Sequence, residues 1–296
     1  MRVPALPVRY NHPYMETAAP KSNALVHLSC LQLPEWVSRH PWLWHGFSTR
    51  LSGVSSAYSA DGSPSDLNLG FTSEDVRENV LENRLRLAEA VSGSRQTPLV
   101  SIHQVHSGVS LVFRRGDPPW AEIPQADGVL TDAPGLLLAV QTADCIPVLV
   151  ADPSHRVVAA FHAGWRGTVQ RIVEHGVAHM AAEFGSDPGS LIAAIGPGIG
   201  ACCYTVGPEL RDRFEQSFSY ADDLFLPASP EIPDQPRAWK LDLIEANRRQ
   251  LLAAGLSPGS IATLGGCTAC QPTRFFSHRA QHGRAGRMMS LIGIRQ

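Results

Sequence analysis

The stretch that decides the fold is LLLAVQTADCIPVLVADPSHRVVAAFHAGWRG, residues 136–167. It contains three apolar runs of strand length, at 136–140, 146–150 and 157–161, separated by short polar segments. Uninterrupted apolar runs of about four to eight residues are typical of strands that are buried on both faces. We therefore expect these runs to be neighbouring strands inside a layered fold.

Segments with helical periodicity lie on both sides of this region. Apolar residues three and four positions apart predict a helix over 169–184 that ends near Gly185. The sequence therefore indicates a single layered α/β domain with mixed β-sheets flanked by helices. The other predicted elements are a helix from a cap at Thr72–Asp75 to Gly93, strands at 191–195 and 288–294, and a helix at about 241–254.

The composition indicates a globular protein and argues against several other classes of protein. With 296 residues, 44% of them hydrophobic, the chain can bury a large core. A net charge of -2 gives no basic footprint for nucleic acid. Since we find no membrane segment and no signal peptide, we expect a cytoplasmic location. Residues 1–24 are rich in proline and predict a flexible arm. Residues 25–296 predict one domain, in which 222–237 form a surface loop.

The six cysteines are too sparse for a disulfide scaffold in a chain of this length. Cys202 and Cys203 are adjacent, and Cys267 and Cys270 form a single CxxC. One CxxC without a second pair is a weak signal for zinc or for redox chemistry. We interpret Cys267 and Cys270 as structural thiols, because free cysteine is commonly buried.

A histidine, a cysteine and a second histidine lie beside the apolar runs. They are His106, Cys145 and His162. Two imidazoles and a thiolate can occupy three corners of a zinc tetrahedron and leave the fourth open, as catalytic zinc requires. Taken singly, each histidine can be a hydrogen-bonding residue and the cysteine a small buried apolar residue. The spacing alone leaves these alternatives open.

Asp144 directly precedes Cys145. Its carboxylate can orient a ligand imidazole or accept a proton from water activated by a metal. The alternative is a turn residue between two strands.

Several loops carry groups suited to an anion. The turn His162–Thr168 follows a strand, and its glycines and Arg166 can bind an oxyanion at a helix N-terminus. Arg50 and Arg279 suit phosphate, although each can equally be a surface or ion-pair residue. The glycine loop 196–200 either cradles a ligand or makes a tight turn.

Several motifs follow one another in fixed order along the chain: STRxxGVS (48–55), LNLG (67–70), QVH (104–106), ADG (126–128), TADCxP (142–147), HAGWRG (162–167), GPGIGxCCY (196–204), FFSxR (275–279) and GRM (286–288). Taken together, these motifs resemble the YfiH, or laccase-domain, family from about Gly46 to Ile294. The resemblance implies a fold related to that of cysteine-hydrolase toxins. Two departures from the family pattern occur near the end of the chain, Ala280 in place of a second arginine and Ala285 in place of the threonine of TGR.

The resemblance implies a zinc-dependent purine nucleoside phosphorylase for adenosine, inosine and 5′-methylthioadenosine that also has adenosine deaminase activity. It implies that His106, Cys145 and His162 bind Zn²⁺, with Cu²⁺ an alternative occupant of the same ligands. Its partners would be purine nucleosides and phosphate, bound by a monomer or a homodimer. The substrate or phosphate contacts we assign are Arg50, Asn68, Gln104, Arg166 and Arg279, and the catalytic residues are the three ligands and Asp144.

Three alternatives remain. One is an amidase that edits peptidoglycan precursors, a role also attributed to members of this family. Another is a hydrolase in which Cys145 is the nucleophile and His162 the base. The third is a multicopper polyphenol oxidase, which we disfavour because twelve histidines include no HxH pair.

Overall fold

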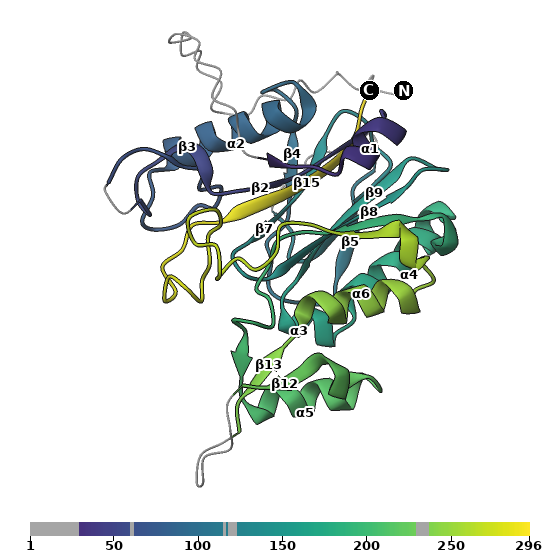
Figure 1. The fold of residues 1–296 in the computed structure, drawn as a ribbon. Coiled ribbons are helices and arrows are strands. Elements are labelled where there is room, and N and C mark those ends of the chain that lie inside the picture. The colour runs from purple at the N-terminus through teal and green to yellow at the C-terminus, as the bar shows by residue number, and fades with distance from the viewer. Residues whose placement is uncertain (1–29, 60–61, 115–116, 118–122, 229–236) are drawn as a thin grey trace, which may run out of the picture.

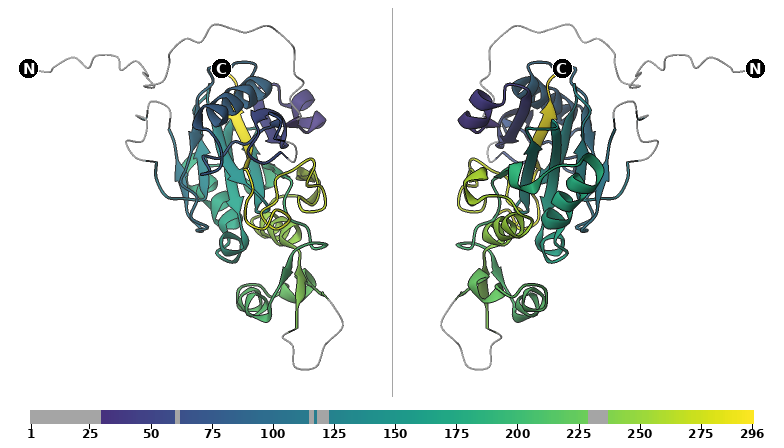
Figure 2. Two further views of the ribbon diagram at one scale, coloured as in Figure 1. Left: turned by 90° about the vertical axis from the view of Figure 1, so that its left-hand side faces the viewer. Right: turned by 90° about the vertical axis from the view of Figure 1, so that its right-hand side faces the viewer.

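The computed structural model describes residues 30–59, 62–114, 117, 123–228 and 237–296, so the predicted arm at 1–24 lies outside the described residues. Two large mixed sheets form the centre of the molecule, and helices cover their outer faces (Figures 1 and 2). The predicted α/β class, with mixed sheets flanked by helices, is confirmed. No helix in the described ranges is both long and apolar enough to cross a membrane.

The first sheet has five strands, and its central strand, β15, is the last strand of the chain. The strand predicted at 288–294 lies between β2 and β7 and pairs antiparallel with both. The strand predicted at 136–140 is β7, shifted by one or two residues. In sheet order the strands are β1 (Cys30–Leu31), β2 (Leu43–Ser48), β15 (Met288–Ile294), β7 (Leu137–Thr142) and β4 (Leu99–Ser101).

The second sheet has six strands and contains the other two runs of the deciding stretch. These runs form the antiparallel hairpin β8–β9. The strand predicted at 191–195 is β10, which pairs with β8. In sheet order the strands are β14 (Ile261–Thr263), β10 (Ile192–Ile195), β8 (Ile146–Asp152), β9 (Val157–Ala163), β6 (Gly128–Thr131) and β5 (Ser110–Val112).

The alternation of side chains along the buried strands explains why these strands are apolar throughout. Leu138 of β7 lies in the core between the two sheets together with Leu149 of β8. The neighbouring Leu137 points the other way, toward α2 (Arg77–Ser92). Because both faces of each central strand are covered, neither face carries a polar pattern.

On the outer face of the second sheet, β9 packs against α4 (Ile172–Phe184). An added Cβ on Gly176 of α4 would lie 2.2 Å from the ring of Phe161. The glycine therefore lets the helix approach the strand closely. Complete burial of a phenylalanine side chain contributes about 2–3 kcal/mol to folding.

Two sequence predictions are corrected. The helix expected over 169–184 is α4, which begins only at Ile172. Val169 instead ends the short helix α3 (Trp165–Val169), and Arg171 between the two helices adopts a left-handed φ of 58°. The surface loop expected over 222–237 contains η2 (Ala221–Leu224) and β12 (Phe225–Pro227), and residues 229–236 lie outside the described residues. The predicted C-terminal glycines, Gly93 and Gly185, do end α2 and α4 in left-handed conformations.

A third, small sheet lies beside the helical face of the second sheet (Figure 1). Its strand order is β11 (Thr205–Val206), β13 (Trp239–Leu241) and β12. The helix predicted at about 241–254 is α6 (Leu243–Ala253), which starts after the N-cap Asp242. The remaining elements are α1 (Pro34–Arg39), β3 (Leu51–Ser55), η1 (Pro188–Ser190), α5 (Pro208–Ser217) and η3 (Pro258–Ser260).

Candidate metal centre

The β8–β9 hairpin brings Cys145 and His162 together. Ile146 is the partner of Ala163 and Pro147 is the partner of His162 in the antiparallel register. Cys145, one residue before β8, therefore lies beside the end of β9. A shift of the register by one residue would turn His162 to the other face of the sheet.

The third donor comes from the loop after β4 and is held by Asp127. The buried Asp127 carboxylate accepts the backbone N–H of His106 at 3.0 Å and that of Ser107 at 2.6 Å. These bonds hold His106 in a left-handed conformation with φ of 61°, which is uncommon for a residue other than glycine. Asp127 directly precedes β6, which pairs with β9, so the anchor and His162 belong to adjacent strands.

The three side chains form one compact group of metal donors. Their ligand atoms all lie within 4.8 Å of one another, and Cys145 Sγ lies 3.8 Å from His106 Nε2. His162 is buried, whereas Cys145 and His106 are only half-buried. The group is therefore covered on the strand side and accessible on the side of His106.

Asp127 also fixes the orientation of the His162 ring. Its Oδ1 atom lies 2.8 Å from Nδ1 of His162, so Nε2 is the ring nitrogen left for a metal. A histidine that binds a metal commonly donates its other N–H to a carboxylate in this way. This orientation and the donor set of two imidazoles and a thiolate both fit a zinc ion.

The charges in this group shift three pKa values. Burial raises the pKa of the Cys145 thiol, but the charge of His162 and hydrogen bonds from both histidines outweigh burial and lower it to about 6. Burial lowers the pKa of His162, but the Cys145 thiolate and Asp127 raise it to about 9. Burial also opposes ionisation of Asp127, whose pKa is nevertheless lowered to about 2 by hydrogen bonds from His162 and Ser107. The thiolate that a metal needs is thus present near neutral pH.

Comparison with known proteins assigns the chain to a family. Residues 44–295 match the family described as "Multi-copper polyphenol oxidoreductase laccase". The crystal structure of the Bacillus licheniformis hypothetical protein YfiH is similar, with a TM-score of 0.79 and 33% identity over 92% of this chain and 98% of that one. This chain belongs to the YfiH family.

Relatives of this chain carry functional names. "Purine nucleoside phosphorylase YlmD" of Geobacillus stearothermophilus is 36% identical, over 86% of this chain and 95% of the relative. "Adenosine deaminase RL5", from an unknown prokaryotic organism, is 33% identical over 77% of this chain and 87% of the relative.

Asp144 of this YfiH-family chain adopts a left-handed φ of 90° next to Cys145. Its Oδ1 accepts a hydrogen bond from the hydroxyl of Thr268 at 2.6 Å, and its Oδ2 accepts one from the backbone N–H of Arg279 at 2.7 Å. The carboxylate that bonds to a ligand imidazole is that of Asp127 instead. Asp144 thus ties the Cys145 turn to the C-terminal loops.

The structure places three of the assigned substrate residues in internal contacts. Arg50 forms a bidentate ion pair with the buried Asp66, at 2.8 and 2.6 Å, which is the alternative that the sequence left open. The buried side chain of Asn68 bonds to Gly70 and Asp75. Gln104 exchanges two hydrogen bonds with the backbone of Gln141 in β7.

Arg166 and Arg279 are exposed, and both belong to segments that adjoin the metal donors. Arg166 follows His162 by four residues, and the backbone N–H of Arg279 donates to Asp144, the neighbour of Cys145. Their guanidinium groups lie over the rings of Trp165, at 4.4 Å, and Tyr204, at 5.2 Å. Burial raises the pKa of Tyr204 to about 12, with smaller effects from the charges of Cys145, Arg279, Asp144 and Arg166. Tyr204 directly follows Cys203, and its ring lies under the guanidinium of Arg279. The HAGWRG turn leads into the five-residue α3, not directly into the longer α4.

Sequence reasoning missed Asp127 and Tyr204. Both belong to motifs that carry the family resemblance, ADG at 126–128 and GPGIGxCCY at 196–204. Asp127 follows an alanine and precedes a strand, as many turn residues do, and only the pairing of β6 with β9 shows that it faces His162. The sequence signal that could have identified Asp127 and Tyr204 was their place in these motifs, since an aspartate or a tyrosine alone does not indicate a functional role.

Proposed function

We propose that this chain is a zinc-dependent purine nucleoside phosphorylase that also deaminates adenosine, with inosine and 5′-methylthioadenosine as further substrates. One observation carries the proposal: His106, Cys145 and His162 form a three-donor group in a chain that matches named phosphorylases over most of its length. Three protein ligands leave one tetrahedral position for substrate or water, as in catalytic zinc sites.

When bound, zinc supplies Lewis acidity, which polarises a substrate oxygen or lowers the pKa of water. Asp127 keeps Nδ1 of His162 engaged, so that the ring presents Nε2 to the ion. In phosphorolysis a phosphate oxygen bonds to C1′ of the ribose while the bond from C1′ to the purine breaks, which yields ribose 1-phosphate and the free base. In deamination the oxygen of water bonds to C6 of adenine and ammonia leaves.

Arg166 and Arg279 are our candidates for binding phosphate. Both are exposed, and each planar guanidinium already lies over an aromatic ring, which restricts its motion. A guanidinium can bind two oxygens of a phosphate at once. Arg50 is a weaker candidate, because its guanidinium donates to Asp66 and to the carbonyl oxygens of Pro272 and Tyr58.

Copper is the competing occupant, since imidazole and thiolate also bind copper ions tightly. The trinuclear cluster of a multicopper oxidase needs many histidines close together. Among the described residues, the one group of potential metal donors that contains histidine has two of them, His106 and His162. This donor set favours one metal ion with an open position, and we propose zinc for it.

A nucleoside panel tests the proposed function. Protein purified without added metal is assayed with adenosine, inosine and 5′-methylthioadenosine, with and without phosphate, and its metal content is measured. We expect ribose 1-phosphate from adenosine and inosine, and 5-methylthioribose 1-phosphate from 5′-methylthioadenosine, only with phosphate. We also expect ammonia from adenosine without phosphate, and loss of both activities on chelation with recovery on addition of zinc. Failure to convert any of these nucleosides in the zinc-loaded protein would contradict the proposal.

The geometry also favours a second candidate, a cysteine hydrolase. Asp127, His162 and Cys145 lie in the order carboxylate, imidazole and thiol that such enzymes use. Chelation separates the two candidates, because a thiol nucleophile keeps its activity without metal and loses it on alkylation. The zinc enzyme shows the opposite response to chelation.

A further inference from the structure

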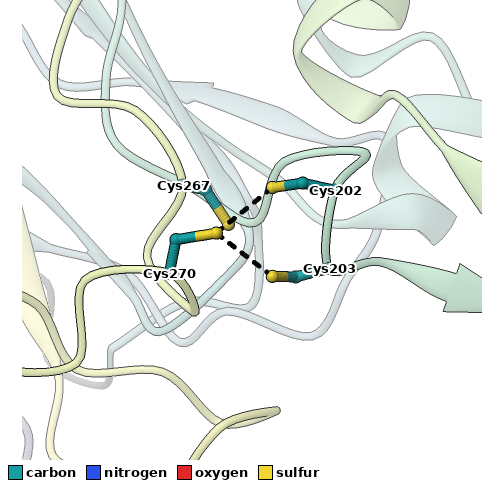
Figure 3. Close-up of side chains that lie close together, drawn as sticks. All are labelled: Cys202, Cys203, Cys267 and Cys270. Atoms are coloured by element: carbon teal, nitrogen blue, oxygen red, sulfur yellow. Dashed lines mark hydrogen bonds between the residues drawn. The ribbon is translucent and has the colours of Figure 1, made fainter.

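Four cysteines from two distant loops meet at a second place in the fold (Figure 3). Cys202 and Cys203 lie in the turns between β10 and β11, and Cys267 and Cys270 lie after β14. All four sulfur atoms lie within 4.8 Å of one another. Cys270 Sγ lies 3.4 Å from Cys202 Sγ and 3.3 Å from Cys203 Sγ.

These sulfur separations fit four ligands of one ion. A tetrahedral zinc ion with Zn–S bonds of about 2.3 Å places its sulfurs about 3.8 Å apart. The observed separations, from 3.3 Å to under 4.8 Å, bracket that value. A disulfide needs about 2.05 Å between two sulfurs, and it would join them in pairs rather than as four.

The backbone around the sulfurs holds the two loops in register. The N–H of Thr268 donates to the carbonyl of Gly198 at 2.9 Å, and Gly198 and Cys267 form an isolated β-bridge. An added Cβ on Gly200 would lie 3.2 Å from Cys267 Cβ and 3.4 Å from Cys202 Sγ. Glycine at this position leaves room for the sulfurs to converge.

The environment of the four thiols favours a bound cation. Cys202 and Cys270 are exposed and the other two are half-buried, whereas free cysteine is among the most buried residue types. Four thiolates around a divalent ion carry a net charge of about -2. The ammonium of Lys240 lies at the margin, 3.2 Å from the carbonyl oxygen of Cys202 and 2.8 Å from the hydroxyl of Thr205, where it can offset this charge.

We propose that Cys202, Cys203, Cys267 and Cys270 bind one structural zinc ion, separate from the one at the His106–Cys145–His162 centre. With four protein ligands this ion has no open position, so its role is to join the two loops. The loops lead directly to the first centre, because Tyr204 follows Cys203 and the hydroxyl of Thr268 donates to Asp144. The ion thereby fixes the residues that surround the Cys145 turn.

Metal counting tests the second site in the full chain, purified under reducing conditions and loaded with zinc alone. We expect two zinc ions per chain in the wild type, one in His106→Ala, and one in Cys203→Ser or Cys270→Ser. Cys30→Ser is the matched control, because Cys30 lies in β1 away from both groups, and it should retain two. Cobalt bound to His106→Ala should show the intense thiolate charge-transfer bands of an all-sulfur tetrahedral site, and these bands should be lost when Cys270→Ser is added.

A measurement on the wild type alone tests the proposal even if the cysteine variants do not fold. X-ray absorption of the zinc-loaded protein should give about 2.5 sulfur ligands per zinc as the mean of the two sites, against about one if only the first centre binds. One zinc per chain with about one sulfur ligand would overturn the proposal.

Discussion

Oδ1 of Asp127 lies 2.8 Å from Nδ1 of His162 and 3.0 Å from the backbone nitrogen of His106. One carboxylate oxygen therefore positions two of the three metal donors, although they come from different elements. The other oxygen accepts two hydrogen bonds from Ser107. Asp127 is fully buried, so its contacts are not exchanged for water.

We predict that Asp127→Asn weakens zinc binding at this centre by about 10- to 100-fold, because the imidazole loses its charged partner and the loop loses an acceptor. Competition with a chromophoric chelator measures the affinity. Asp152→Asn is the matched control, since Asp152 is also buried and accepts from His155 Nδ1 at 2.8 Å, away from the centre. Equal loss of affinity in both variants would show that the effect is general destabilisation.

Gly164→Ala should disrupt the centre sterically. An added Cβ would lie 2.8 Å from Cδ2 of His106 and 2.9 Å from Cys145 Sγ. Two of the three donors would have to move, so we expect at least a 10-fold loss of zinc affinity and of activity. The same substitution at Gly259, where an added Cβ meets nothing within 4 Å, should leave both unchanged. Wild-type metal binding in Gly164→Ala would refute this account of the geometry.

The central strands could be predicted because burial on both faces leaves a local signal. β7, β8, β9 and β15 are apolar along their length, and each was expected within two residues of its observed bounds. The break between α3 and α4 could not be predicted, because it depends on a left-handed Arg171 in a segment whose apolar periodicity continues. Periodicity reports which face is buried, not whether the backbone is continuous.

The metal donors of the candidate site could be predicted from the sequence, but the residues that contact or surround them could not. His106, Cys145 and His162 carry a donor chemistry that is visible in the sequence, and the structure brings them together. Whether Arg50 is free to bind a substrate depends on its ion pair with Asp66, which no local sequence pattern indicates. The convergence of Cys202 with Cys270 depends likewise on the pairing of two distant loops.

Core packing gives a prediction for stability. Leu149 is fully buried between the two sheets, so Leu149→Ala should lower the free energy of unfolding by about 2–5 kcal/mol. Leu226, which is 61% exposed on β12, is the control, and Leu226→Ala should change it by less than about 0.5 kcal/mol. Urea unfolding of both variants in the same buffer measures the difference. Similar values for the two would contradict the sheet-on-sheet core.

The lowered pKa of the buried His45 predicts that the stability of the fold depends on pH. Burial lowers its pKa from 6.5 to about 4, and its Nε2 accepts the backbone N–H of Leu33 at 2.8 Å. Between these pH values the unfolded chain binds a proton that the folded chain does not, so stability falls as the pH is lowered from about 6.5 to about 4.

Urea unfolding of metal-free protein at pH 5 and pH 7.5 tests this, since metal loss then makes no contribution. His45→Gln should reduce the difference in unfolding free energy between the two pH values, whereas His175→Gln, at an exposed site on α4, should keep it. An unchanged difference in His45→Gln would mean that other groups carry the dependence.

Arg50 and Arg166 should respond differently to substitution. Arg50→Ala leaves the Asp66 carboxylate, which is 5% exposed, without its partner, and such a loss typically costs about 3 kcal/mol of stability. We therefore expect phosphorolysis and deamination to fall by the same factor, with an unchanged KM for phosphate. Arg166→Ala removes an exposed guanidinium near the donors, so the KM for phosphate should rise about 10-fold while deamination falls less.

Asp66→Asn is the control for the ion pair and should reproduce the stability loss of Arg50→Ala. A raised KM for phosphate in Arg50→Ala at wild-type stability would instead place Arg50 at the phosphate, because a residue engaged only in internal contacts with Asp66, Tyr58 and Pro272 should not change substrate affinity without changing the fold.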